Sequence, residues 1–316
     1  MINILFIGPF KSPISFHKDY HYDFLPFISK KYNTYCIDTF NMHNKKIDIE
    51  KIVKEKFDTN NKTLIYFTPA QWLEHPKNNK IINHTKYYKL YDVWDQKIDY
   101  QFNKILKPNK FNGFVYKFKS KEMDDLMKWT PKMDHYSWYT YCNENYFNNW
   151  NQKKIYDVLF FGSYNKNNYP LRCRLLPILQ NLHNKNLIKF RFINRNENLF
   201  LKDLSVEINK AYLTVTCKTR THDRFLSKYQ EIPFSYSCLL GNIPSRYRDL
   251  LEGNMIEVDL HMSDMEIANK ILEALSNKKL ILEKTEKLHN KFKKLLNYEQ
   301  GKKDFESIIE QISEKL

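Results

Sequence analysis

The sequence lacks several of the patterns that would place it in a common class at once. No apolar run approaches the roughly 20 residues of a membrane span, so we expect no transmembrane helix. The five cysteines are odd in number, lie far apart and form no C-x-x-C pair, which excludes a disulfide framework and a structural zinc site. Hydrophobic residues make up 42% and aromatic residues 16% of the 316 residues, so the chain can fold around a core.

The first ten residues lack the features of a secretory signal. They contain no basic segment and no small-residue cleavage site, and the run from Ile2 to Ile7 is typical of a buried strand. Together with cysteines that favour reduced thiols, this start predicts a cytoplasmic protein.

Glycine is rare, with six residues, and none belongs to a phosphate-binding motif. Neither G-x-G-x-x-G nor G-x-x-x-x-G-K-[ST] is present, which disfavours a dinucleotide oxidoreductase and a P-loop NTPase. Gly8, Gly162 and Gly241 each end or follow an apolar run. In a doubly wound sheet such positions let the backbone approach a ligand, although each glycine could equally do no more than end its strand.

Positive charge is abundant but unevenly composed, with a net charge of +15. Most of it is lysine that accompanies many Asn, Tyr and Ile residues, as expected of an AT-rich genome, and dispersed lysine usually forms a solvated face. All eight arginines, in contrast, lie between Arg172 and Arg248. Because arginine suits bidentate phosphate binding, this confinement favours a localised anion site.

Short apolar runs alternate with segments of helical spacing along the first half of the chain. We expect strands at Ile2–Ile7, Thr34–Asp38, Thr63–Phe67, Lys89–Val93 and Gly113–Phe118, and helices at Ile47–Phe57 and Lys121–Lys128. Such alternation predicts βαβ units and a mostly parallel sheet.

A polar, Asn-rich stretch at residues 143–154 is typical of a linker, and a new cycle begins after it. The expected strands of this second half are Tyr156–Phe161, Ile188–Ile193, Leu213–Cys217, Ser237–Leu240 and Met255–Val258. We expect a helix over about Leu171–His183 and a helical tail from Met265 onward. The chain therefore reads as two similar α/β halves with a helical tail.

Residues 218–244 contain the parts that a nucleoside diphosphate site needs. Cationic residues precede a predicted helix on which Asp223, Ser227 and Glu231 share one face, with Arg224 and Lys228 beside it. Cations and helix N-terminal amides can hold a pyrophosphate, and a fixed carboxylate can accept both ribose hydroxyls. An exposed amphipathic helix with ordinary salt bridges would explain the same pattern.

The segment from Lys228 to Pro244 resembles the K-Y-x-E-x-x-x-S-G-x-L-L-x-x-x-P signature of GT-B glycosyltransferases, in the group-1-like branch of polysaccharide and spore-coat glycosylation. Other stretches resemble further parts of that family: Asp157–Ser163 with Tyr169–Arg172, Met255–Ile267 and, more weakly, Tyr91–Asp95 and Trp129–Pro131. The resemblance implies an α/β GT-B fold, in which two Rossmann-like doubly wound domains face a central cleft. It implies an acceptor-side domain at 1–150, a nucleotide-sugar domain at 151–300, and a helix at 301–316 that packs back on the first domain.

The resemblance also implies an activity and a set of donor-binding residues. The activity is transfer of a sugar from a UDP-, GDP- or dTDP-sugar to a hydroxyl of a glycan or glycoprotein, without a metal cofactor and, in the favoured version, with retention. Glu231 matches the carboxylate that binds the donor ribose, Lys228 and Arg224 lie near the diphosphate positions, and Gly162 and Ser163 match the loop beneath it. The other predicted donor-binding residues are Arg172, Lys218, Arg220, Gly241 and Asn242.

Two positions depart from the family pattern. Asp223 stands where the retaining branch often has a Glu eight residues before the ribose Glu, and Ser237 replaces the usual Gly. Both departures concern the sugar end of the donor more than the nucleotide end. Asp223 is nevertheless a candidate catalytic residue.

The acceptor side should come from the first half of the chain. His17 and His21 follow the first predicted strand, and Asp92 ends another, so these three are the further catalytic candidates. An inverting enzyme would use one of them as general base, whereas a retaining enzyme needs no protein base. Asp92-x-x-Asp95 has the wrong spacing for a metal-binding D-x-D loop, and cations can replace Mg²⁺ at the diphosphate.

Two other functions fit parts of the sequence. Lysines interleaved with aromatic residues, as in residues 86–89 and 116–119, are typical of nucleic-acid-binding surfaces, but no recognised nucleic-acid-binding motif supports that function and no nucleic acid is expected. A degenerate GT-B scaffold would be suggested by loss of Glu231, which is present. The basic surface is also compatible with peripheral contact to a membrane.

Overall fold

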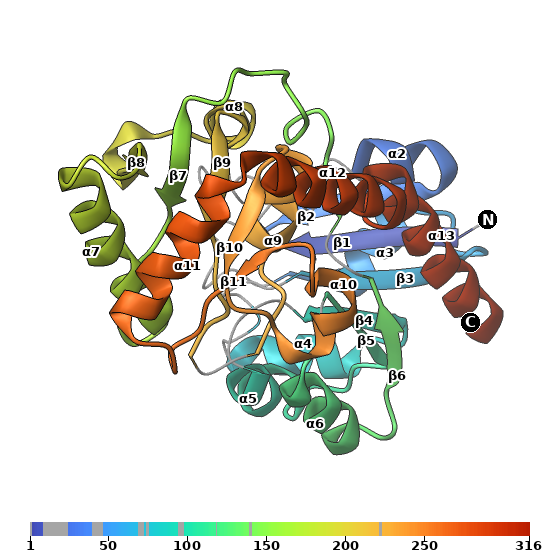
Figure 1. Ribbon diagram of the computed structural model, residues 1–316. Helices are drawn as coiled ribbons and strands as arrows, with labels where there is room; N and C mark the ends of the chain where they lie inside the picture. The colour runs from blue at the N-terminus through green and yellow to red at the C-terminus, as the bar shows by residue number, and fades with distance from the viewer. Residues whose placement is uncertain are drawn as a thin grey trace. The chain divides into compact units, whose positions relative to one another are not determined.

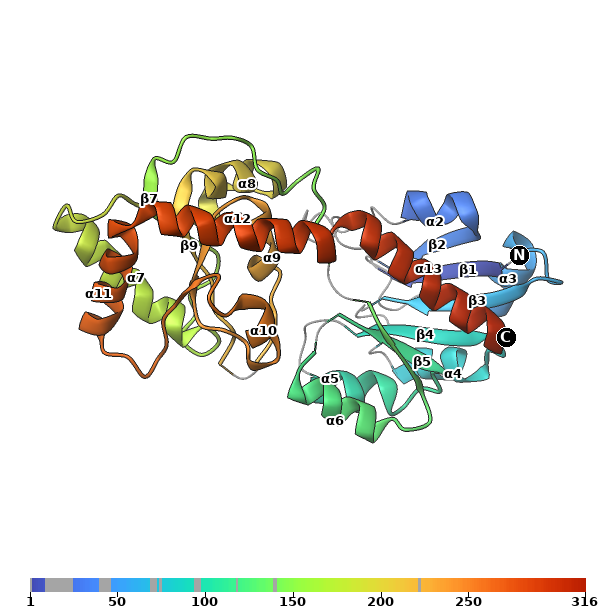
Figure 2. The same cartoon turned by 45° about the vertical axis from the view of Figure 1, so that its right-hand side comes forward.

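The structure is a computed structural model, and it describes residues 2–8, 25–39, 47–68, 73, 76–93, 98–117, 119–138, 141–220 and 223–316. The chain divides into two compact units, with boundaries after residues 140 and 298. Unit 1 contains residues 1–140 and 299–316, and unit 2 contains residues 141–298. Figures 1 and 2 show the elements of both.

Unit 1 is built on six parallel strands in the order β2-β1-β3-β4-β5-β6. The strands are β1 Ile2–Gly8, β2 Asn33–Asp38, β3 Lys62–Phe67, β4 Tyr88–Val93, β5 Gly113–Tyr116 and β6 Asp134–Ser137. The helical segments are α2 Leu25–Lys31, α3 Ile49–Lys56, α4 Pro76–His84, α5 Ile98–Gln101, the π-helix η2 Phe102–Leu106 and α6 Lys121–Trp129. Strands β1 and β4 are buried over their whole length and β3 over all but its first residue, as expected of a parallel sheet covered on both faces.

The last helix, α13 (Tyr298–Lys315), packs on unit 1 alongside β1 and β3 (Figure 2). The Phe305 ring lies 5.7 Å from that of Tyr66 and 4.8 Å from that of Trp138. The Trp138 indole also donates to the carbonyl of Gly301 at 3.0 Å. This hydrogen bond fixes the position of α13 along its own axis, in addition to the lateral packing of Phe305.

Unit 2 contains five parallel strands in the order β11-β10-β9-β7-β8. The strands are β7 Tyr156–Phe161, β8 Phe190–Ile193, β9 Ala211–Val215, β10 Cys238–Gly241 and β11 Ile256–Glu257. The helical segments are α7 Pro170–Asn184, η3 Arg195–Glu197, α8 Leu201–Asn209, α9 Lys228–Phe234, η4 Ser245–Tyr247, α10 Arg248–Leu251, α11 Asp264–Ser276 and α12 Lys278–Leu295. One core packs α7 and α11 against the sheet, and a second core packs α8, α9 and α12 against it (Figure 1).

Two separate parallel sheets with intervening helices confirm the predicted α/β fold class. The Asn-rich stretch belongs to unit 2, where Gln152 N donates to the Asn209 side chain at 2.8 Å. One local prediction was wrong. Helix α9 begins at Lys228, so Asp223 lies in the preceding loop and does not share a helix face with Glu231. None of the helices in the described part of the chain has the length and hydropathy needed to cross a bilayer.

Candidate nucleotide site

The carboxyl ends of the parallel strands β7, β9 and β10 meet at one edge of the unit 2 sheet. Strand β10 ends at Gly241, where an added Cβ would lie 1.7 Å from the carbonyl oxygen of Thr216. Only glycine therefore lets the strand ends after β9 and β10 approach this closely. Loops at such an edge are where α/β sheets bind ligands.

Strand β7 runs into Gly162, which has a φ of +85°. An added Cβ there would lie 2.8 Å from Lys228 Cε and 3.6 Å from Arg172 Nη1. Glycine adopts this left-handed backbone without strain, and its missing side chain leaves the space beside the turn open. Two cationic side chains from different helices converge on this turn.

Arg172, in the first turn of α7, is 1% exposed. Its Nη1 donates to the Ser163 carbonyl at 3.1 Å, and the guanidinium lies 4.5 Å from the centre of the Tyr169 ring. Its Nε and Nη2 are buried and find no hydrogen-bond partner among the described residues. Because buried donors normally bond to something, these two are suited to an anionic ligand.

Lys228 begins α9, and its ammonium lies 4.3 Å from the centre of the Phe161 ring. Burial and the neighbouring Arg172 lower the pKa of Lys228 to about 8, although Glu231 opposes the shift. Within the described part of the chain, neither Lys228 nor Arg172 has a carboxylate at ion-pair distance. Two cations held together without a paired carboxylate favour a bound anion.

The carboxylate of Glu231 lies in the first turn of the same helix and is 3% exposed. The structure therefore brings Gly162, Arg172, Lys228 and Glu231 together at one edge of unit 2. Sequence reasoning missed the aromatic supports, Phe161 and Tyr169, beneath the two cations. Their positions directly before Gly162 and three residues before Arg172 were the available signal.

Lys218, in the loop after β9, contacts Asp223 in the same loop and Asn242 in the loop after β10. The Lys218 ammonium lies 2.9 Å from Asp223 Oδ1, and the Lys218 backbone N–H donates to Asn242 Oδ1 at 3.1 Å. Of the other predicted donor-binding residues, Arg224 is buried, Arg220 is exposed, and Ser163 uses its carbonyl to accept from Arg172.

In unit 1, the predicted catalytic residue Asp92 is completely buried. Its Oδ2 accepts from the Tyr66 hydroxyl at 3.0 Å and lies 3.2 Å from Lys117 Nζ, whose ammonium packs 3.4 Å from the centre of the Trp138 ring. These contacts support a structural role for Asp92 in this conformation. His17 and His21 lie outside the described residues.

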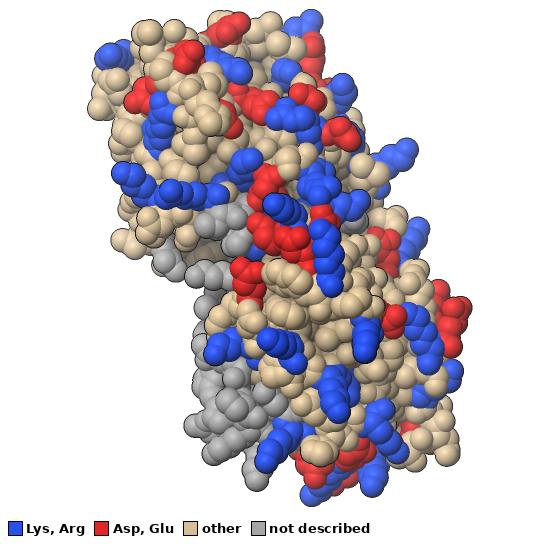
Figure 3. Space-filling model, turned by 90° about the horizontal axis from the view of Figure 1, so that it is seen from below, with Lys and Arg blue, Asp and Glu red and all other residues tan. Residues whose placement is uncertain are grey.

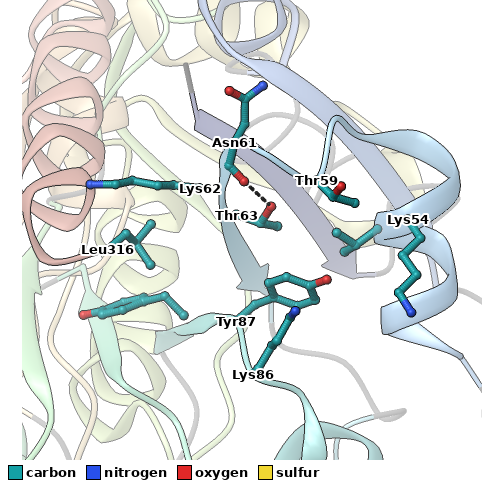
Figure 4. Close-up of a pocket in the computed structure, with 10 residues that line it drawn as sticks. Lys54, Thr59, Asn61, Lys62, Thr63, Lys86, Tyr87 and Leu316 are labelled. Carbon is teal, nitrogen blue, oxygen red and sulfur yellow. Dashed lines mark hydrogen bonds between the residues drawn. The ribbon is translucent and has the colours of Figure 1, made fainter.

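A pocket of about 630 Å³ opens in unit 1, where β3 and β4 begin. Figure 4 shows its lysines pointing different ways: Lys62 turns toward α13, whereas Lys54 turns to the opposite side. The Lys62 ammonium donates to the Ser313 carbonyl at 2.9 Å. The lysines do not converge as the cations of unit 2 do, so the pocket does not form a comparable anion site.

On the face drawn in Figure 3, Lys and Arg side chains are scattered among Asp and Glu and do not form one patch. Among the described residues, no group of three or more His, Cys, Asp or Glu side chains is arranged to hold a metal ion.

Comparison with known proteins gives matches only at the level of structure. No protein-family profile and no curated protein sequence matches the chain. Sucrose-phosphate synthase from Thermosynechococcus elongatus is similar over 100% of both chains, with a TM-score of 0.63 and 9% identity. HepE from Anabaena, in complex with UDP and glucose, is similar over 98% of this chain and 100% of its own, with a TM-score of 0.61 and 10% identity.

The match to a third similar structure covers less of that protein's chain. The pneumococcal O-GlcNAc transferase GtfA, in complex with UDP and GlcNAc, is matched over 79% of this chain and 57% of that one, with a TM-score of 0.54 and 11% identity. At these identities the likeness concerns the fold. The chain has the fold of the GT-B glycosyltransferases.

Proposed function

We propose that the protein is a glycosyltransferase that binds a nucleotide-sugar at the carboxyl edge of the unit 2 sheet. The observation that carries the proposal is a pair of cations, the buried Arg172 and the half-buried Lys228, which converge on Gly162 one helical turn from the carboxylate of Glu231. Similar structures have UDP and a sugar bound, which supports the same ligand class here.

Each of these residues has a distinct task in this proposal. The free donors of Arg172 and the ammonium of Lys228 bind the diphosphate, and the missing side chain of Gly162 leaves room for it. Glu231 accepts hydrogen bonds from both ribose hydroxyls. The dianion raises the pKa of Lys228 and keeps the lysine protonated when the ligand is bound.

The same cations assist the chemistry. In the transfer, the bond between the sugar C1 and the β-phosphate oxygen breaks, and a bond from C1 to the acceptor hydroxyl oxygen forms. Negative charge develops on the departing diphosphate, so Arg172 and Lys228 stabilise the transition state more than the ground state. In a retaining reaction the acceptor proton passes to the departing phosphate oxygen, without a protein base or a metal ion.

The acceptor in this proposal is a hydroxyl of a glycan or glycoprotein. Unit 1 supplies its binding residues, and His17 and His21 remain candidates for that side. A cytoplasmic location fits the reduced thiols: the described structure contains all five cysteines as free thiols.

A thermal-shift screen against UDP, GDP, dTDP, CMP and their sugars tests the proposal. A ligand at about 100 times its dissociation constant stabilises a protein by about 2.7 kcal/mol, so one nucleoside diphosphate should raise the melting temperature by several degrees. Arg172→Met should abolish that rise. If no nucleotide shifts the wild type while RNA or DNA binds in a salt-sensitive way, the glycosyltransferase assignment is wrong.

A further inference from the structure

The loop after β9 is joined to the loop after β10 by a group of polar contacts that the proposed reaction does not use. Asp223 Oδ2 accepts from the backbone N–H of Ser245 at 2.8 Å and from the Ser245 hydroxyl, and Asp223 Oδ1 lies 2.9 Å from Lys218 Nζ. Asn242 accepts from the Lys218 backbone on the other side of the same junction. We call Lys218, Asp223, Asn242 and Ser245 the loop brace.

Aromatic packing joins the same two loops. Phe225, two residues after Asp223, stacks on Tyr247 at 4.4 Å and 21° and on Tyr229 at 5.4 Å and 20°. The Tyr229 hydroxyl donates to the Asn242 carbonyl at 2.5 Å. Because Tyr229 follows Lys228 in α9, the junction of the two loops also fixes the helix that carries Lys228 and Glu231.

The surroundings of Asp223 differ from those of a carboxylate that contacts a sugar or transfers a proton. Oδ2 already accepts twice from Ser245, and the neighbouring cation Lys218, 2.9 Å from Oδ1, balances the charge. Burial alone would raise the pKa of Asp223, but the Ser245 hydroxyl and Lys218 hold it below its ordinary value. A general base needs a pKa nearer the working pH.

We propose that Asp223 is a positioning residue that locks the loop after β9 to the loop after β10, so that α9 presents Lys228 and Glu231 to a nucleoside diphosphate. The proposal rests on the proposed function for its ligand. It assigns the ammonium of Lys218 to the brace as well, and not to the diphosphate.

Binding of UDP to the full chain, measured by calorimetry, separates positioning from catalysis because UDP carries no sugar. Asp223→Ala removes all three contacts and should weaken UDP binding about tenfold. Asp223→Asn keeps an amide oxygen for Ser245 and should stay within about threefold of wild type. Asp249→Ala, which removes an exposed carboxylate of α10, should leave binding unchanged.

The opposite pattern would overturn the proposal. If Asp223→Ala and Asp223→Asn both bind UDP as wild type does, but release UDP from UDP-glucose at least 100 times more slowly, Asp223 is catalytic. Ser245→Ala provides a second, milder variant. It should weaken UDP binding less than Asp223→Ala, and combining the two should add nothing further, because both act through one contact.

Hydrogen exchange of the Ser245 amide tests the brace without any nucleotide. In ligand-free protein this amide should exchange at least tenfold faster in Asp223→Ala than in wild type or Asp249→Ala. Unchanged exchange would disprove the brace even if UDP binds. Failure of wild type to bind any nucleotide would instead refute the proposed function, and the exchange result would still decide the role of Asp223.

Discussion

Each unit contains a lysine that is desolvated against an aromatic ring, and the two lysines differ in what balances their charge. Lys117 of unit 1 packs on Trp138 and lies 3.2 Å from Asp92, whereas Lys228 of unit 2 packs on Phe161 and lies beside Arg172. Burial lowers the pKa of both to about 8. The difference indicates that a buried cation with its own carboxylate is part of the core, whereas a half-buried cation beside another cation is suited to a ligand.

The largest expected effect is the loss of stability in Lys117→Met. Removing one partner leaves the buried charge of Asp92 unpaired, which typically costs about 3–5 kcal/mol. Urea unfolding should show this loss, while UDP affinity stays at the wild-type level. The double variant Lys117→Met/Asp92→Asn should recover most of the stability. If Lys117→Met instead weakened UDP binding and left unfolding unchanged, the roles of the two lysines would be reversed.

Lys228→Met should give the converse result. Loss of a charge-assisted hydrogen bond of about 1.5–3 kcal/mol predicts UDP binding that is about 10–100 times weaker. Stability without ligand should be unchanged or slightly higher, because the variant no longer buries a charge near Arg172. Calorimetry and urea unfolding of the same preparation check both parts. A marked loss of stability with normal UDP affinity would make Lys228 a core residue.

Gly162→Ala should have a smaller effect, for which unit 2 provides a matched control. A left-handed φ costs a non-glycine residue roughly 1–2 kcal/mol. Gly253 has a comparable φ of +75° but open space around its Cβ position, whereas the Cβ at Gly162 would press on Lys228. Both alanine variants should lose stability, and only Gly162→Ala should also bind UDP several-fold more weakly. Equal UDP affinities would show that no ligand uses the space at Gly162.

The smallest effect is the pH dependence that Lys228 gives to binding. UDP affinity should fall by up to about tenfold between pH 7 and 9, since Lys228 deprotonates near pH 8 while the phosphate, whose own pKa is about 6, stays fully charged. In Lys228→Met the affinity should be flat over this range. A fall of the same size in the variant would assign the titration to another group.

Unfolding without ligand should respond to pH in the opposite direction. The folded pKa of about 8 lies below the ordinary lysine value of 10.5, so between these values the unfolded chain binds more protons. Lys228 therefore contributes stability that increases as the pH rises from about 8 to 10.5, and Lys117 does the same in unit 1. Measurements of ligand affinity therefore distinguish the roles of the two lysines, whereas the pH dependence of folding does not.

Much of the fold could be predicted from the sequence because a parallel sheet needs apolar strands. The strands predicted at Ile2–Ile7, Thr63–Phe67 and Tyr156–Phe161 lie within β1, β3 and β7, which are wholly or mostly buried. Strand β6, with the sequence Asp-His-Tyr-Ser, was missed because this edge strand is polar and only partly buried. Hydrophobic pattern therefore predicts central strands better than edges.

The site was predicted unevenly for a related reason. Confinement of arginine to one region, together with the family resemblance, drew attention to Arg172, Lys228 and Glu231. The pairing of Asp223 with Ser245 joins positions 22 residues apart in different loops, and no local spacing indicates it. The same holds for Asp92 and Lys117, which lie in and after neighbouring strands. Charge composition shows which residues are cationic, whereas only the fold shows which are already paired.

The most direct test of the central claim compares UDP with 2′,3′-dideoxy-UDP by calorimetry, in wild type and in Glu231→Ala. If Glu231 binds both ribose hydroxyls, wild type should prefer UDP by tenfold or more. Glu231→Ala should bind UDP at least tenfold more weakly than wild type does, and should not distinguish the two ligands. A folded Glu231→Ala variant that binds UDP as tightly as wild type, with the same preference over the dideoxy compound, would contradict the account.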